Sequence, residues 1–317
     1  MQINKDTIED ITIYKVISGS KAYGTSTPES DTDVRGIAIV PDKRYYYGFI
    51  KNFEQYMDNT NDVQIYDIRK FFALARACNP NIIEILEINN PKLILKETKW
   101  STILKENKHK FLSMKAALTF SGYAFAQLQR IETHRKWLLN PPEHYPMRTE
   151  FGLDEKQSMS FEKLQAMNKL INDGQMQDAN IIQYIQKENN FRNACMHYKQ
   201  YEEWKKTRNE KRAELEAKYG YDTKHASHLV RLLRMGKEIL TIGKVIVERN
   251  DAQELIDIRS GKSSYDEIIN YAKQIDAEIK ELYKQPEKCN VPYSPNEDEL
   301  DELCTNIVNQ YLNEVKM

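Results

Sequence analysis

The sequence has no long hydrophobic run. No apolar stretch in its 317 residues approaches the roughly 20 residues that a helix needs to cross a bilayer. Residues 1–6 contain no apolar core of a secretion signal. We therefore expect a cytoplasmic protein without a membrane partner.

Cysteine is also scarce. The four cysteines, Cys78, Cys195, Cys289 and Cys304, lie far apart, and no two of them have the spacing of paired metal ligands. This pattern disfavours a disulfide framework and a zinc site, and it favours reduced thiols.

The sequence has no excess of either charge. It contains 46 Lys and Arg residues and 47 Asp and Glu residues, which gives a formal net charge of -1. A broad, non-specific nucleic-acid binder is usually basic, so the composition lowers the expectation of that class. An RNA substrate stays compatible with the composition, because a basic cleft can be hidden in a neutral total. The length allows one large domain or two moderate ones.

The most informative feature present is a Gly-Ser turn followed by two carboxylates. Gly19 and Ser20 follow an apolar run at residues 11–17, and Asp31 and Asp33 lead into a second apolar run. Residues two apart on a strand point to the same face, so the two carboxylates are expected to converge. Carboxylates for a hard metal and exposed amides for phosphate are what nucleotidyl transfer requires. The ordered combination predicts a nucleotidyltransferase that uses Mg²⁺ or Mn²⁺ and an NTP, with ATP or CTP expected.

Two segments carry a family resemblance. Residues 19–25 and 30–36 resemble the nucleotide-binding motif of the DNA polymerase β superfamily of nucleotidyltransferases. They are similar, more closely, to the predicted nucleotidyltransferases found beside RNA-repair ligases in bacteria and phages. Further similarity lies at residues 66–72, 79–84, 224–234 and 258–262.

The resemblance implies roles for the motif residues. It implies that Gly19 and Ser20 contact the triphosphate and that Asp31 and Asp33 bind two divalent metals. RNA, either a tRNA or an RNA 3′ end, is the expected acceptor by analogy with RNA repair. The alternatives are nucleotidylation of a protein or small molecule, and a nucleotide-binding module without catalysis.

The resemblance also implies a third carboxylate on a neighbouring strand, and the sequence offers two choices for it. Asp62 and Asp67 bracket a strand-like run and point to opposite faces. Asp67 is explained as the N-cap of a following helix, so we favour Asp62 as the third catalytic and metal-binding carboxylate. Glu84 is a weaker candidate, since it is also explained as an exposed helical position.

A basic helical face is expected near the C-terminal third. Lys224, His228 and Arg231 stand at i, i+4 and i+7 and therefore share one face of a helix. We expect them to hold phosphate, because Lys and Arg neutralise developing charge in phosphoryl transfer. The alternative explanation is a solvated basic face.

Three further residues were considered for the site. Lys21 and Arg35 flank the motif and are expected to contact phosphate, although flanking charges often stay solvated. His225 stands three residues before His228, a spacing that allows a metal. No cysteine lies close to the two histidines in the sequence, so we expect no zinc.

The hydrophobic pattern changes from strand-like to helical at Asp67, which predicts the α+β class. We expect a small mixed β-sheet nucleotidyltransferase core followed by a largely α-helical region. Strands are expected at about residues 11–17, 34–40, 44–48 and 62–66. Helices are expected from Asp67 to Asn79 and at about residues 81–88, 97–107, 112–138, 155–173, 178–206, 224–246, 264–284 and 296–315.

The same pattern suggests three domains. We expect a catalytic domain at residues 1–110, a helical domain at 111–285 that completes the cleft, and a linker with a C-terminal helix at 286–317. The prolines of residues 140–146 exclude a regular helix there and predict a loop.

Overall fold

The computed structural model describes residues 4–49, 53–156, 158–208 and 210–315. It divides into two compact units, one formed by residues 1–131 with 223–317 and the other by residues 132–222. This division differs from the boundaries expected at residues 110 and 285. The chain leaves the first unit within a helix and returns to it at Thr223.

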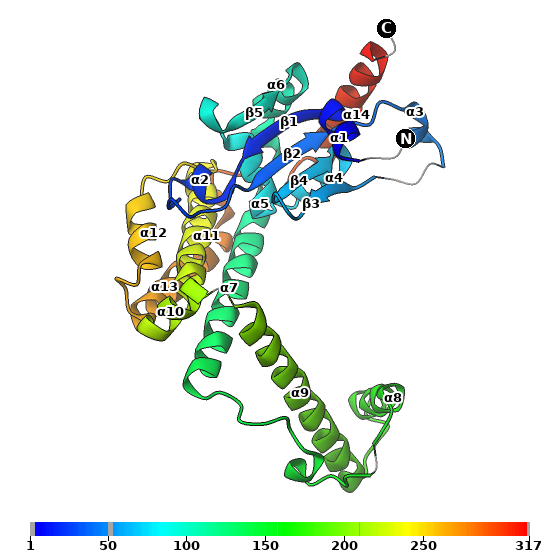
Figure 1. Ribbon diagram of the computed structural model, residues 1–317. Helices are drawn as coiled ribbons and strands as arrows, with labels where there is room; N and C mark the ends of the chain where they lie inside the picture. Colours follow the sequence, from blue (N-terminus) through cyan, green and yellow to red (C-terminus); the bar gives the residue numbers. More distant parts are fainter. Residues whose placement is uncertain (1–3, 50–52, 157, 209, 316–317) are drawn as a thin grey trace. The chain divides into compact units, whose positions relative to one another are not determined.

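A five-stranded mixed sheet lies in the first unit (Figure 1). Its strands are ordered β3-β4-β2-β1-β5, and β2 and β4 are its parallel pair. The strands are β1 (Thr12–Ile17), β2 (Val34–Ala38), β3 (Gln55–Asp58), β4 (Val63–Asp67) and β5 (Ile94–Glu97). The expected α+β class, with a small mixed sheet followed by many helices, is confirmed.

The strand expected at residues 44–48 is wrong, because this segment is helix α3 (Lys43–Tyr47). The aromatic run favours a strand, but local capping decides otherwise: the Asp42 side chain accepts a hydrogen bond from the Arg44 amide at 2.9 Å. The Gly48 amide closes the turn on the Arg44 carbonyl. The short strands β3 and β5 were not expected, since four residues at the sheet edge carry little periodic signal.

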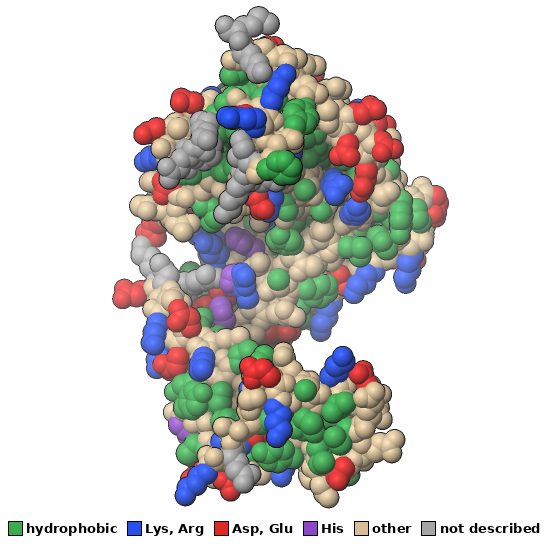
Figure 2. Space-filling model, turned by 90° about the vertical axis from the view of Figure 1, so that its right-hand side faces the viewer, with side chains coloured by type: hydrophobic (Ala, Val, Ile, Leu, Met, Phe, Trp, Pro, Cys, Tyr) green, Lys and Arg blue, Asp and Glu red, His purple; other side chains and the backbone are tan. Residues whose placement is uncertain are grey.

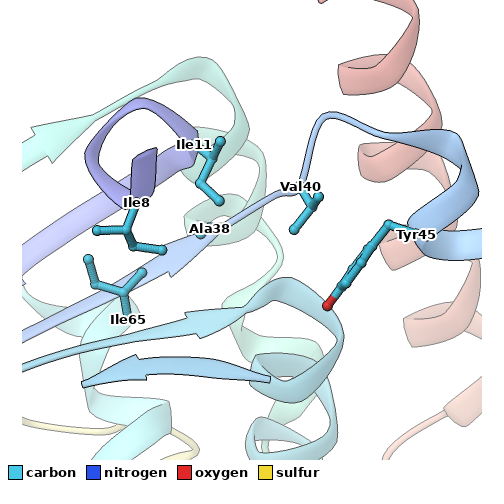
Figure 3. Packing of buried hydrophobic residues seen from close by; sticks show 6 residues of the cluster. All are labelled: Ile8, Ile11, Ala38, Val40, Tyr45 and Ile65. Atoms are coloured by element: carbon cyan, nitrogen blue, oxygen red, sulfur yellow. The ribbon is translucent and has the colours of Figure 1, made fainter. Parts of the chain in front are cut away.

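Helix α1 (Lys5–Ile11), which the sequence analysis did not predict, packs against the sheet (Figure 3). Its buried side chains join residues of β2, β4 and α3 in one apolar cluster. The cluster consists of Ile8, Ile11, Ala38, Val40, Tyr45 and Ile65. Burial of such side chains contributes about 1.5–3 kcal/mol each, and this packing supports the end of the sheet away from the motif.

The longer helices of the first unit lie near their predicted positions, whereas the short helices Gly19–Tyr23 and Ala252–Arg259 were not predicted. The remaining helices of this unit are α2 (Gly19–Tyr23), α4 (Ile68–Ala75), α5 (Pro80–Ile83), the 3₁₀ helices η1 (Glu84–Glu87), η2 (Pro91–Leu93) and η3 (Lys108–Phe111), α6 (Lys99–Glu106), the first part of α7 (Lys115–Leu139), α11 (Thr223–Ile242), α12 (Ala252–Arg259), α13 (Tyr265–Tyr283), η5 (Pro286–Lys288) and α14 (Glu297–Glu314). Within this unit α7, α11 and α13 meet at Gly236, where a β-carbon would stand 2.9 Å from Phe120 Cβ. Glycine therefore permits this close helix packing.

The C-terminal helix α14 packs on the N-terminal part of the chain. Tyr311 contacts Trp100 with ring centroids 5.9 Å apart, and Asn309 accepts a hydrogen bond from the Tyr47 hydroxyl at 2.6 Å. The segment after residue 286 is therefore part of the first unit.

The second unit is helical. After the end of α7 and the loop expected at residues 140–146, it contains η4 (Arg148–Phe151), α8 (Phe161–Asn172), α9 (Ala179–Thr207) and α10 (Glu210–Tyr219). The rings of Trp137, Tyr201 and Trp204 pack together in it. No helix in the described part of the chain combines the length and the apolar character that a membrane span requires.

Candidate functional site

The Gly-Ser segment lies directly after the central strand β1. It is the start of the short helix α2 and not the simple turn that was expected. Gly19 has a φ of +65°, and a β-carbon at this position would stand 1.9 Å from Asp33 Oδ2. Two features require glycine at this position: the left-handed backbone conformation and the close approach of the Asp33 carboxylate.

Asp31 and Asp33 lie in the loop before β2 and not on a strand. The expected strand geometry is wrong at these two positions, because pairing with β1 begins only at Val34, opposite Ile17. The loop nevertheless brings both carboxylates to one pocket. Asp62, which immediately precedes β4, lines the same pocket.

The carboxyl groups of Asp33 and Asp62 lie close enough in the pocket for each to shift the pKa of the other. Burial, and then the neighbouring carboxyl group of Asp62, raise the pKa of Asp33 to about 6. The interaction with the Asp33 carboxyl group lowers the pKa of Asp62. Two neighbouring carboxylates of this kind share one proton, and a bound cation would favour both in the ionised form.

Arg35 holds the Asp62 loop in place. Its NH1 donates to the Asp62 carbonyl at 3.0 Å and to Asp62 Oδ1 at 3.1 Å, while NH2 lies 3.8 Å from Asp33 Oδ1. Lys21 hydrogen-bonds to Thr32 in the motif loop. Neither Arg35 nor Lys21 is among the residues that line the pocket, so the structure places both beside it.

Asp67 stands at the opposite end of β4 from Asp62. It caps α4 by accepting from the Arg69 amide at 3.0 Å and forms an ion pair with the Arg69 guanidinium at 3.2 Å. Its burial raises the pKa of the carboxyl group. Asp67 does not line the pocket, and the capping role expected from the sequence accounts for its position.

The pocket has a volume of about 260 Å³ and lies within the first unit. Acidic residues from the sheet side face Lys224, His228 and Arg231 on α11, so the helical spacing correctly placed these three together. The lining residues are Ser20, Tyr23, Thr25, Glu29, Ser30, Asp31, Asp33, Asp62, Lys224, Ser227, His228, Arg231, Leu255 and Arg259.

Beneath the pocket, Tyr23, Glu84 and Arg231 form a buried cluster. The Tyr23 hydroxyl donates to Glu84 Oε1 at 2.7 Å, and the Arg231 guanidinium lies 3.8 Å from the Tyr23 ring centroid. Arg231 NH1 is 3.7 Å from Glu84 Oε2. Glu84 is 3% exposed, so the exposed position considered for it is wrong. Burial raises the pKa of Glu84, and Arg231 and the Tyr23 hydroxyl lower it in part.

Several pocket residues were not expected to take part in the site. Glu29 immediately precedes the segment that carries the resemblance, and Arg259 lies within the block at residues 258–262. The similarity of that block to the family could therefore have indicated Arg259 as a site residue. Ser227 likewise lies within the block at residues 224–234. Leu255 carried no signal, because its place in the pocket follows from the packing of α12 on α11, where the Ser227 hydroxyl donates to the Leu255 carbonyl at 2.9 Å.

Comparison with known proteins supports this reading of the motif. Residues 3–154 match the family model RlaP, described as "RNA repair pathway DNA polymerase beta family". The match confirms the resemblance to polymerase β-type nucleotidyltransferases for that part of the chain.

One relative is an uncharacterized 38.9 kDa protein encoded in the nrdC-mobD intergenic region of Enterobacteria phage T4. It is 30% identical over 133 residues, which cover 38% of this chain and 38% of the phage protein. The aligned region thus spans well under half of that relative. No solved structure matches the chain.

Proposed function

We propose that this chain, whose residues 3–154 match the RNA repair pathway family of DNA polymerase β type, is a metal-dependent nucleotidyltransferase. It moves a nucleoside monophosphate from an NTP to an RNA acceptor, either a tRNA or an RNA 3′ end. The observation that carries the proposal is the convergence of Asp31, Asp33 and Asp62 with Ser20 in one pocket. These residues come from three separate segments and supply the groups that nucleotidyl transfer requires.

The three carboxylates suit a divalent cation such as Mg²⁺ or Mn²⁺. Hard cations prefer carboxylate oxygens. Burial and the neighbouring Asp62 carboxyl raise the pKa of Asp33, as expected where carboxyl groups are gathered in one pocket. Asp31 and Asp33 are the proposed ligands, with Asp62 as the third. When bound, the cation stabilises negative charge on the phosphates and acidifies the acceptor hydroxyl.

Residues in and beside the pocket have separate roles in the proposed reaction. Asp62 accepts the proton of the acceptor hydroxyl, whose oxygen attacks the α-phosphorus while the bond to the pyrophosphate oxygen breaks. Arg35 keeps Asp62 in position through its 3.1 Å hydrogen bond. Gly19 and Ser20 contact the phosphates, and His228 lines the opposite wall.

RNA is preferred as the acceptor because the matched family is described by RNA repair. On the face shown in Figure 2, Lys and Arg side chains are interspersed with Asp and Glu. Such a surface attracts RNA only weakly over long range, since neighbouring opposite charges cancel. Recognition is therefore expected to depend on local contacts and to be sensitive to the acceptor's end structure.

The test is a transfer assay with each α-labelled NTP and with Mg²⁺ or Mn²⁺. Total tRNA, a protein fraction and a small-molecule fraction are offered separately as acceptors. We expect label on RNA from ATP or CTP, and loss of labelling with EDTA. In the double variant Asp31→Asn, Asp33→Asn, labelling should disappear while the fold stays nearly unchanged, because removing two close negative charges relieves repulsion.

The alternatives give different outcomes. Label on protein or on a small molecule would refute the RNA acceptor and keep the reaction class. NTP binding without transfer to any fraction would instead indicate a nucleotide-binding module. Full transfer by the double variant would refute the role of Asp31 and Asp33.

A further inference from the structure

We infer that Arg259 and Lys224 form the phosphate-binding side of the pocket, and that Arg231 is a positioning residue held by Glu84. The inference rests on the proposed function, because the phosphates concerned are those of the NTP. It differs from the sequence analysis, which grouped Arg231 with Lys224 and assigned no role to Arg259.

The two proposed cations form no ion pair with any acidic residue in the described ranges of the chain. Within the described part of the chain, Arg259 makes no hydrogen bond or ion pair, and Lys224 forms no ion pair, although both line the pocket. Lys224 lies near enough to the carboxylates that its charge lowers the pKa of Asp33. A cation without a partner keeps its full charge for an anion that enters the pocket. The planar guanidinium group of an arginine can also donate two parallel hydrogen bonds to two phosphate oxygens.

Other basic residues in this region are already paired with carboxylates. Arg234 on α11 forms ion pairs with Asp251 and Glu254, and Arg249 pairs with Glu238. These pairs neutralise the arginines locally. Arg259 at the end of α12 is different, because it lines the pocket without forming an ion pair with any of the described residues.

Arg231 belongs with the paired group. Arg231 is only 6% exposed. Its Nη1 atom lies 3.7 Å from Glu84 Oε2, and its guanidinium group stacks over the Tyr23 ring. The negative charge of Glu84 offsets most of the attraction that Arg231 would exert on a phosphate. Tyr23 is the last residue of α2, which begins at Gly19. The Glu84–Tyr23–Arg231 cluster therefore ties α2 to α11 and η1 and holds the Gly-Ser segment in place.

Charge complementarity selects a triphosphate as the ligand class. Carboxylates line the sheet side of the pocket, and Lys224 and Arg259 line its helical side. A triphosphate with bound Mg²⁺ presents metal charge to the first group and free phosphate oxygens to the second. A neutral ligand would not compensate the positive charges of Lys224 and Arg259.

The first experiment is calorimetric titration of the full chain with Mg²⁺-tripolyphosphate and with Mg²⁺-ATP and Mg²⁺-CTP. Arg259→Gln should weaken tripolyphosphate and the bound NTP by the same factor, about tenfold to a hundredfold, since a hydrogen bond to a charged group is lost. Lys224→Gln should act in the same direction, and Arg259→Lys should be intermediate. Lys262→Gln is the matched control, because Lys262 is 66% exposed and already paired with Asp257; its affinity should stay within about twofold.

The second experiment concerns the buried pair. Glu84→Gln combined with Arg231→Gln removes both charges together, so no unpaired charge is left buried. We expect tripolyphosphate affinity within about twofold of the wild type and a clear fall in the single-turnover transfer rate, as for a group that acts by positioning. Thermal melts of every variant confirm that it is folded.

The outcomes separate the two proposals. If the wild type binds neither NTP nor tripolyphosphate, the proposed function itself fails. If the wild type binds both and Arg259→Gln binds them equally well, the inference alone is overturned. It is also overturned if the double Gln variant loses as much affinity as Arg259→Gln, because Arg231 would then be a phosphate ligand.

Discussion

Asp33 Oδ2 occupies the space that a β-carbon at Gly19 would need, at a separation of 1.9 Å. The Gly-Ser segment and the Asp33 carboxylate are thus packed against each other, so the position of one constrains the position of the other.

Gly19→Ala should therefore impair metal binding as well as stability. The left-handed backbone of Gly19 costs an alanine about 1–2 kcal/mol, and the new methyl group must displace the Asp33 carboxylate. Gly174→Ala is a matched control, because Gly174 has a similar φ of +70° and nothing within 4 Å of its β-position. Urea unfolding should show comparable backbone strain in both variants, and Mn²⁺ titration should show weakened binding in Gly19→Ala alone. Equal Mn²⁺ affinity in the two variants would contradict the coupling.

Metal affinity should depend on pH with a break near the pKa of Asp33, about 6. Below this pH the shared proton competes with the cation, so the apparent affinity should fall up to tenfold per pH unit; above it the affinity should level off. The measurement is Mn²⁺ titration between pH 5 and pH 8. Asp62→Asn removes the negative neighbour that raises this pKa, so its break should move to lower pH. An affinity that does not change across this range would rule out the shared proton.

Asp62→Asn should lower the transfer rate severely while sparing nucleotide affinity, as expected for a group that acts in the transition state. The substitution is well matched, because Asn tolerates the positive φ of 46° at this position. Asp67→Asn should leave transfer unchanged and cost at most about 1 kcal/mol, since Asn caps helices as well as Asp does. Single-turnover kinetics and nucleotide titration of both variants measure these two effects. An inactive Asp67→Asn variant together with an active Asp62→Asn variant would show that Asp67, and not Asp62, is the third catalytic carboxylate.

Arg231→Ala should lower the free energy of unfolding by about 3–5 kcal/mol, because it leaves the Glu84 carboxylate buried without its cation. The double variant Glu84→Gln, Arg231→Gln should recover much of this loss. Urea unfolding of the single and double variants measures the difference. An Arg231→Ala protein as stable as the wild type would show that the pair carries no structural role.

Short-range sequence patterns determined much of this protein. The cap at Asp67, the loop at residues 140–146 and the shared face of Lys224, His228 and Arg231 depend on residues within a few positions of each other. Their geometry follows from helical spacing and backbone hydrogen bonding. The motif around Gly19 and Asp33 also predicted the resemblance to polymerase β-type nucleotidyltransferases, which the family match over residues 3–154 confirms.

Only the tertiary structure decided the rest. It brings together residues that are far apart in the chain. Asp33 lies beside Asp62, Glu84 is buried against Arg231, and Arg259 lines the same pocket as the three aspartates. Whether a charged side chain is solvated, paired or left facing a cavity depends on which distant segments pack beside it. Local periodicity contains no information about those partners, because burial and charge compensation arise only when the segments meet.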